Sequence, residues 1–244
     1  GRSVARELGR RLAVTVPLAL AAILISYCLA IPLGVYTARA RGRAGAAWIE
    51  FLLYALYSIP PFWGGLMLCV LFGATGPDLP FWPRLPLLGL HDKDAASLGW
   101  FAYARDTLLH AILPIVSMSY ASLAYITRQM RTSMSEVLGE EFVRALRARG
   151  LSERSIVYRH VLRNALLPVV TLVGSVLPAL IGGSVIVETI FDLPGMGKYA
   201  YEGLLRRDLS VVMTTTVLMG VMTQLGLLLS DGLYGLVDPR VRHG

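Results

Sequence analysis

The residues most able to make specific interactions lie in one basic stretch, from Arg128 to Arg163. This stretch holds eight arginines, at positions 128, 131, 144, 147, 149, 154, 159 and 163. Guanidinium groups bind carboxylates and phosphates through charge-assisted hydrogen bonds, and they cannot be deprotonated to act as bases. The stretch therefore predicts binding rather than catalysis, and the partner is nucleic acid, anionic lipid or a protein.

Motifs for covalent chemistry are absent from the sequence. It contains no G-x-x-x-x-G-K-[ST] phosphate loop, no H-E-x-x-H and no G-x-S-x-G. The four histidines are scattered without ligand spacing, and both cysteines, Cys28 and Cys69, lie in apolar blocks where a free thiol packs as a small hydrophobe. We therefore expect that this chain is not an enzyme and holds no metal, cofactor or disulfide.

Long apolar blocks must position the basic stretch. Of the 244 residues, 55% are hydrophobic and only 16% are charged, which is unusual for a soluble domain of this length. A helix needs about 20 apolar residues to cross the hydrocarbon core of a bilayer. Five blocks approach that length: Leu12–Tyr36, Trp48–Phe72, Leu108–Thr127, Leu166–Ile190 and Val211–Val237. We predict an all-α polytopic membrane protein, with a basic pre-span segment over residues 1–11 and a transmembrane domain over residues 12–237.

The arginines also orient the chain, because Lys and Arg near the ends of spans favour the cytoplasm. The arginines after the first span, those of residues 128–166, and Arg240 and Arg242 of the tail 238–244 share one side if the spans alternate. That side is predicted to be cytoplasmic, and segments 73–106 and 191–210 then lie outside. The arginines before residue 12 disagree. A missing upstream span would reconcile them and give six spans in the intact protein; a short amphipathic helix at the interface is the alternative.

The loop 128–166 is predicted to contain two short amphipathic helices. The first covers 140–149, Gly150 suits the left-handed residue that follows a helix, and Ser152 is a good N-cap for the second helix. Tethers at both ends leave little room to enter a DNA groove. Passive contact with anionic lipid explains the arginines but not the Gly-Leu-Ser turn. The apolar faces and the turn favour docking to a soluble partner.

At this point the sequence resembles a known family. The stretch EEFVRALRARGLSERSIVYRHVLRNALLPVV resembles the cytoplasmic coupling loop of ABC importer permeases, and it is similar in particular to their dipeptide/oligopeptide/nickel branch. The segments ISYCLAIPLGVYTARARG, GGSVIVETIFDLPGMGKYAYEGLLRRDLSVV and DGLYGLVDPRVR match the same branch in the same order. The general permease pattern has Glu-Ala-Ala where this chain has Arg144-Ala145-Leu146, and Ile-x-Leu-Pro where it has His160-Val161-Leu162-Arg163. These departures fit the peptide branch and put sugar substrates in doubt.

The resemblance implies a fold, a function and partners. It implies the type I transmembrane-domain fold of ABC importers, in the bacterial inner membrane, forming a translocation path for di- or oligopeptides. The implied partners are a second homologous permease, two ATPase subunits that bind ATP and Mg, an extracytoplasmic substrate-binding protein and membrane lipid, with no nucleic acid. The surface seated in the ATPase would comprise Arg144, Ala145, Ala148, Gly150, Leu151, Ser152, Arg154, His160, Arg163 and Asn164. An outer gate or binding-protein contact would comprise Glu188, Pro194, Gly195 and Gly197, and an ordinary polar turn is the alternative there.

An ion-gradient-driven secondary transporter or channel is the alternative function. It would require a carboxylate or an inverted repeat at mid-membrane. Glu50, Glu188 and Asp231 instead lie near predicted span ends, where we expect them to satisfy helix termini or pair with arginine. The sequence leaves the substrate open among dipeptides, longer peptides, peptide-like antibiotics and metal chelates, because affinity in such systems resides largely in the binding protein.

Overall fold

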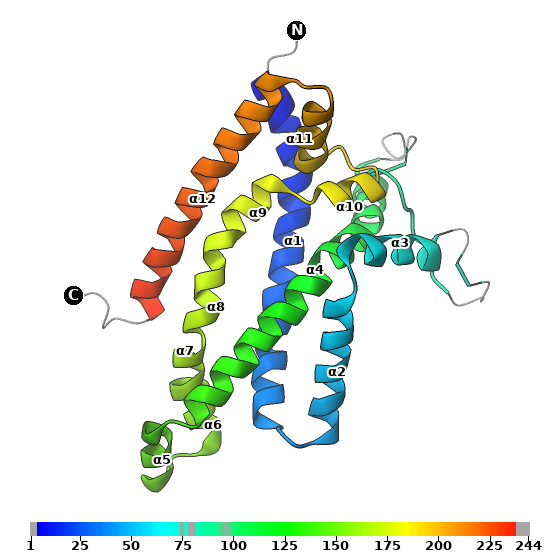
Figure 1. Ribbon diagram of the computed structural model, residues 1–244. Helices are drawn as coiled ribbons and strands as arrows, with labels where there is room; N and C mark the ends of the chain where they lie inside the picture. Colours follow the sequence, from blue (N-terminus) through cyan, green and yellow to red (C-terminus); the bar gives the residue numbers. More distant parts are fainter. Residues whose placement is uncertain are drawn as a thin grey trace. The chain divides into compact units, whose positions relative to one another are not determined.

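The structure is a computed structural model that describes residues 4–73, 76–77, 82–92, 94, 97 and 99–237. Across these residues the regular structure is helical and no strand occurs (Figure 1). This confirms the all-α prediction. The chain divides into two compact units. The first unit comprises Gly1–Ile23, Ile59–Tyr120 and Pro178–Gly220, and the second comprises Leu24–Ser58, Ala121–Leu177 and Val221–Gly244.

Three single helices are long and apolar enough to cross a membrane. They are α1 (Val4–Arg39), α4 (Trp100–Leu138) and α12 (Leu209–Val237). Two bent pairs pass the same test: α2 (Ala44–Ser58) with α3 (Pro61–Phe72), bent by 102°, and Glu153–Ala165 with Leu167–Gly174, bent by 40°. Counting each pair as one span gives five, the predicted number. The C-terminal tail, with Arg240 and Arg242, lies outside the described residues.

Proline marks the bend in one predicted span, whereas another span continues through its proline. Pro61 occupies the first turn of α3, where a missing N–H costs nothing, and Pro60 precedes it in an extended conformation. The second block therefore breaks between α2 and α3. By contrast, Pro114 lies inside α4, which continues through it and past the expected span end near Thr127. Residues 4–11 are likewise helical and run directly into the first span.

The fourth block, Leu166–Ile190, is not one continuous helix. It is divided into α8 (Leu167–Thr171), a 3₁₀ turn η3 (Leu172–Ser175), α9 (Val176–Gly182) and α10 (Val185–Ile190). Pro168 begins α8, and Gly183, with φ +61°, ends α9 because few other residues adopt the left-handed conformation. The chain then passes through α10 to α11 (Met196–Leu205).

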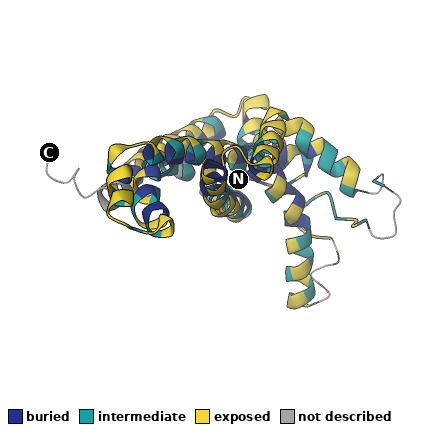
Figure 2. Cartoon of the chain, turned by 90° about the horizontal axis from the view of Figure 1, so that it is seen from below, coloured by how far each residue is buried: buried dark blue, intermediate teal, exposed yellow. Residues whose placement is uncertain are grey.

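The core of the second unit joins the loop helices to the ends of α1 and α4. The loop contains α5 (Glu141–Ala148), α6 (Glu153–Ser155), the π-helix η2 (Ile156–Val161) and α7 (Leu162–Ala165), folded together at the end of α4 (Figure 1). Buried side chains of the loop and of α1 and α4 form one apolar cluster. It includes Ala30 and Val35 of α1, Met130 and Met134 of α4, and Val143, Ile156, Val157, Val161 and Ala165 of the loop. In Figure 2, buried residues are dark blue and exposed residues are yellow.

Many large apolar side chains remain exposed. Trp48, Phe51, Leu108, Met213 and Leu228 are each more than three-fifths exposed. A soluble monomer rarely leaves so much apolar surface in water. Lipid, or a second membrane subunit, is the environment that such a surface requires, which agrees with the predicted membrane location.

Gly34 allows α1 and α4 to pack closely in the second unit. A Cβ atom at this position would lie 2.6 Å from Cβ of Met130 and 3.0 Å from the carbonyl oxygen of Thr127. Since lipid tails are as apolar as the side chains, close van der Waals packing at small residues is a main source of helix association in a membrane.

We therefore expect Gly34→Ala to destabilise the protein by about 1–3 kcal/mol, because the added methyl group must displace Met130 or the α4 backbone. Gly9→Ala is the matched control, since Gly9 lies on the same helix with nothing within 4 Å of the added atom. Thermal unfolding of the detergent-purified variants measures both. An unchanged midpoint for Gly34→Ala would contradict the close packing.

Candidate functional site

The first loop helix ends at a turn that requires glycine. Gly150 has φ +79°, and its amide donates to the carbonyl oxygen of Arg147 at 2.9 Å. The amide of Leu151 then donates to the carbonyl oxygen of Leu146 at 3.3 Å, and both leucine side chains pack on the buried cluster. This is the arrangement of a helix C-terminus closed by a left-handed residue. The predicted helix end, glycine turn and returning leucine are confirmed.

The second loop helix begins at Ser152, as predicted. The Oγ atom of Ser152 accepts a hydrogen bond from the amide of Ser155 at 3.4 Å. Arg147 on α5 pairs with Glu153 in the first turn of the next helix, with Nε and Oε1 2.6 Å apart. Both side chains are about half exposed, so the ion pair adds little stability.

The second helix continues as a π-helix, which the sequence did not indicate. The amide of Leu162 bonds to the carbonyl of Val157, five residues earlier. This wider turn places residues five apart on the same face. Ile156 and Val161 are both 0% exposed for that reason, and Val157 is buried beside them.

The opposite face of the loop carries the residues predicted to contact an ATPase. Eight of them are exposed: Arg144, Ala145, Ala148, Gly150, Ser152, Arg154, Arg163 and Asn164. Leu151 and His160 are half-buried. The ten residues thus lie on one structured segment whose interior is apolar and whose surface is basic. Such a segment can seat against another protein without refolding.

The second predicted site is organised by the buried carboxylate of Glu188 in the first unit. Glu188 is 2% exposed. Its Oε1 atom accepts a hydrogen bond from the hydroxyl of Thr15 on α1 at 2.9 Å, and its Oε2 atom accepts one from the amide of Lys198 in the first turn of α11 at 2.8 Å. The Thr15 hydroxyl oxygen also accepts from the amide of Met196 at 2.7 Å. Glu188 therefore satisfies a helix terminus, one of the two roles expected for it.

Glycines enclose this carboxylate. A Cβ atom at Gly183 or Gly195 would overlap the carboxyl group of Glu188, and one at Gly197 would lie 2.9 Å from the amide nitrogen of Val185. The glycines let the α10–α11 connection close around the charge. Of the four residues predicted at this site, Glu188, Gly195 and Gly197 are buried and only Pro194 is exposed. The three buried residues shape the segment, and Pro194 is available for contact.

The exposed surface of the same segment is mixed. Lys198 pairs with Asp192, whose φ is +50°, with Nζ and Oδ1 2.5 Å apart. On α11, Tyr201, Leu204 and Leu205 are 45–65% exposed. Apolar side chains next to an ion pair, on a short rigid helix, form a surface suited to another protein.

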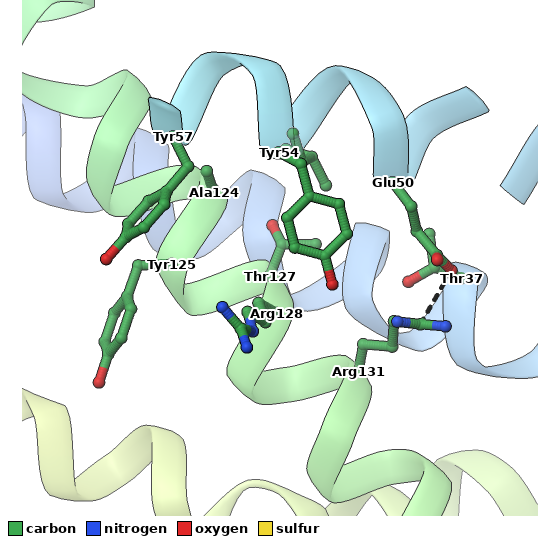
Figure 3. A pocket seen from close by; sticks show the side chains of 10 residues that line it. Thr37, Glu50, Tyr54, Tyr57, Ala124, Tyr125, Thr127, Arg128 and Arg131 are labelled. Atoms are coloured by element: carbon green, nitrogen blue, oxygen red, sulfur yellow. Dashed lines mark ion pairs between the residues drawn. The ribbon is translucent and has the colours of Figure 1, made fainter. Parts of the chain in front are cut away.

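A small pocket between α1, α2 and α4 lies in the second unit (Figure 3). Tyr54, Tyr57 and Tyr125 line it, and the guanidinium of Arg128 lies over the Tyr54 ring, 5.8 Å from its centre. Its volume is about 30 Å³, which is room for one or two water molecules and not for a peptide. At its edge Arg131 pairs with Glu50 at 2.8 Å, as expected for that acid. The pocket is a packing feature that ties α2 to α4.

One cluster of polar groups in the first unit was not predicted from the spacing of residues in the sequence. The structure brings ligand atoms of Asp92, Asp106 and His110 within 4.8 Å of one another. His110 is buried, and its Nδ1 atom lies 2.9 Å from the carbonyl oxygen of Asp106, while the amide of Asp92 donates to the Asp106 carboxylate at 2.7 Å. Asp92 is far from Asp106 and His110 in sequence and is 78% exposed. These bonds tether the segment before α4 to that helix.

The membrane-length helices and the exposed apolar side chains define a class: an integral membrane protein with several helical spans and a structured basic loop. Comparisons with known proteins then give the family. Residues 30–243 match the model of the binding-protein-dependent transport system inner membrane component, and the chain belongs to this family. It is therefore an inner membrane component of a bacterial ABC transporter, as predicted.

Individual relatives support this family assignment. The chain is 37% identical to the dipeptide transport system permease protein DppB of Escherichia coli, over 96% of this chain and 72% of that protein. It is 33% identical to the oligopeptide transport system permease protein AppB of Bacillus subtilis, over 100% of this chain and 73% of that protein. A chain of the inward-facing MetNI methionine ABC transporter has the same fold, with a TM-score of 0.68 at 17% identity over 98% of this chain and 99% of that chain. The predicted type I importer fold is thus supported.

The Glu188 cluster gives a direct test. Thr15→Val should destabilise the protein by about 1–3 kcal/mol, because it leaves the buried amide of Met196 without an acceptor and removes one donor to Glu188. Thr189→Val is the control: its hydroxyl bonds only to a carbonyl of its own helix on an exposed face. Thermal unfolding measures both. Equal midpoints for the two variants would show that the Thr15 bonds contribute nothing.

Proposed function

We propose that this chain is a permease subunit that forms the translocation path for di- or oligopeptides in an ATP-driven importer. Its family membership, and relatives named for dipeptide and oligopeptide transport, support this substrate class. We further propose that the complex contains a second homologous permease, two ATPase subunits and an extracytoplasmic binding protein. ATP and Mg would be bound by the ATPase, since this sequence has no phosphate loop.

Coupling is proposed to run through residues 140–165. The supporting observation is the division of this segment into an exposed basic face and a fully buried apolar face that includes Val143, Ile156 and Val161. An ATPase that moved the exposed face would displace the buried one, because close-packed side chains transmit displacement rather than absorb it. The buried face packs on Met130 and Met134, so α4 would move with the loop. Rigid-body movement of spans is an established way to switch access.

The segment from Glu188 to Asp208 is proposed as the outer contact with the binding protein. Buried Glu188 fixes the position of α11 through bonds to its first turn, and α11 presents Tyr201, Leu204 and Leu205 outward. Pro194, Gly195 and Gly197 set the path of the connection between α10 and α11.

Gly150→Asp should spare membrane insertion but weaken association with the ATPase by about tenfold or more. A side chain at φ +79° costs roughly 1–2 kcal/mol, and the new charge lies among the arginines that would face the partner. Gly99→Asp is a matched control, because Gly99 has φ +88°, equal open space and a place in the first unit. Co-purification of the ATPase reports the result. Equal retention by both variants would remove the docking role from the loop.

Transport itself is tested in proteoliposomes that hold the complete complex with its binding protein and a labelled dipeptide. We expect uptake that requires ATP and stops when the ATPase subunits are omitted. Uptake that persists without ATP and without any partner subunit would contradict the proposal and favour a gradient-driven carrier.

A further inference from the structure

A groove in the second unit combines an apolar wall with a basic end. Ile31, Pro32 and Val35 of α1 form the wall, and its volume is about 380 Å³. Arg39 and Arg43 lie at its basic end, and Arg39 also lines an adjoining cavity of about 440 Å³ together with Arg154. The two cavities share Arg39 and Tyr158 as lining residues, and together they are called here the basic groove.

The three arginines of the basic groove form no ion pair within contact distance in the part of the chain that the structure describes, and Glu153 attracts Arg39 only at longer range. Arg39, Arg43 and Arg154 are exposed, and no carboxylate forms an ion pair with them among those residues. Glu153, next to Arg154 in sequence, is already bonded to Arg147 at 2.6 Å. Three guanidinium groups around one depression repel each other unless an anion lies between them. Guanidinium forks match phosphate oxygens particularly well.

The apolar wall decides what kind of anion fits. Ile31 lies eight residues before Arg39 on the same helix, which corresponds to about 12 Å along its axis. Ile31, Pro32 and Val35 belong to the first apolar block, so they lie at membrane depth, where a soluble ATPase or a free phosphate does not reach. A phospholipid reaches both regions, because its acyl chain follows the wall while its phosphate meets the arginines. Tyr36 and Tyr158 flank the boundary, as tyrosines do at membrane interfaces.

We propose that the basic groove binds the headgroup of an anionic phospholipid from the cytoplasmic leaflet. Arg39 and Arg43 belong to the end of α1 and the turn after it, whereas Arg154 and Tyr158 belong to the loop helices. Arg154 is also among the residues proposed to face the ATPase, so it lies where the lipid site and the ATPase surface adjoin. Arg39 lies over the Tyr158 ring, 6.0 Å from its centre, so the span and the loop already meet there. One bound phosphate would join the inner end of the first span to the coupling loop. This goes beyond passive contact of arginines with a charged membrane, because it requires the positions of three arginines and an apolar wall.

The test uses the assembled transporter in nanodiscs made from equal amounts of phosphatidylethanolamine and phosphatidylglycerol. After detergent extraction, native mass spectrometry counts the phospholipids that remain bound. We expect phosphatidylglycerol to be enriched on the wild type. Arg39→Gln/Arg43→Gln should weaken its retention about 30-fold, which is about fivefold for each lost arginine. Arg10→Gln/Arg41→Gln is the control, because it removes the same charge from exposed positions that do not line the groove.

A second measurement locates the lipid. Phosphatidylglycerol with a photoreactive group on its acyl chain should label residues 31–35, and excess inorganic phosphate should not prevent this. The proposal is overturned if both double variants lose the lipid equally, if phosphate alone displaces it, or if no labelling occurs at the wall. It is also overturned if Arg39→Gln/Arg43→Gln keeps the lipid but releases the ATPase. Arg43→Gln alone, in an exposed turn, provides a milder variant should the double variant fail to fold. None of these readouts depends on peptide transport.

Discussion

The second unit depends on the burial of a few apolar side chains where the loop meets the spans. Val143 from α5 and Ile156 and Val161 from the π-helix are fully buried against Met130 and Met134 of α4. The other face of the loop carries exposed arginines, among them Arg144 and Arg154. Without the buried contact, the glycine turn would leave two short helices free to swing, since helices of this length are marginal alone. Because the loop helices pack on the end of α4, they form one unit with the span that they are proposed to move.

Much of this loop was predictable because its determinants are local. The first loop helix ends where Gly150 takes a left-handed conformation, and the second begins where Ser152 caps it. The apolar spacing indicated the buried face. The π-helix was not predictable from the local sequence, because it depends on the burial of both Ile156 and Val161 in the same core. Tertiary packing, not the sequence of the segment, selects the wider turn.

The first unit shows the limit of local inference more clearly. The Thr15–Glu188 hydrogen bond joins residues 173 positions apart, and no pattern near either residue announces the other. The sequence suggested that Glu188 serves a helix end, which the structure confirms, but not which helix or with what help. The fourth block was also read as one span because hydropathy measures apolar length and not continuity. Gly183 interrupts the helix without interrupting the apolar composition.

The arginines of the basic stretch from Arg128 to Arg163 do not act as one group. Arg131 is paired with Glu50, Arg147 with Glu153, and Arg128 is stacked on Tyr54. The positive-inside rule explains the sign and the side of these charges, because insertion responds to their number. The rule does not explain which sequence positions the arginines occupy. Arg41 contributes to orientation as well as its neighbours do, yet it does not line the basic groove, whereas Arg39 and Arg43 do. Orientation therefore accounts for how many arginines follow the first span, and the proposed phospholipid headgroup accounts for why Arg39 and Arg43 converge beside the coupling loop.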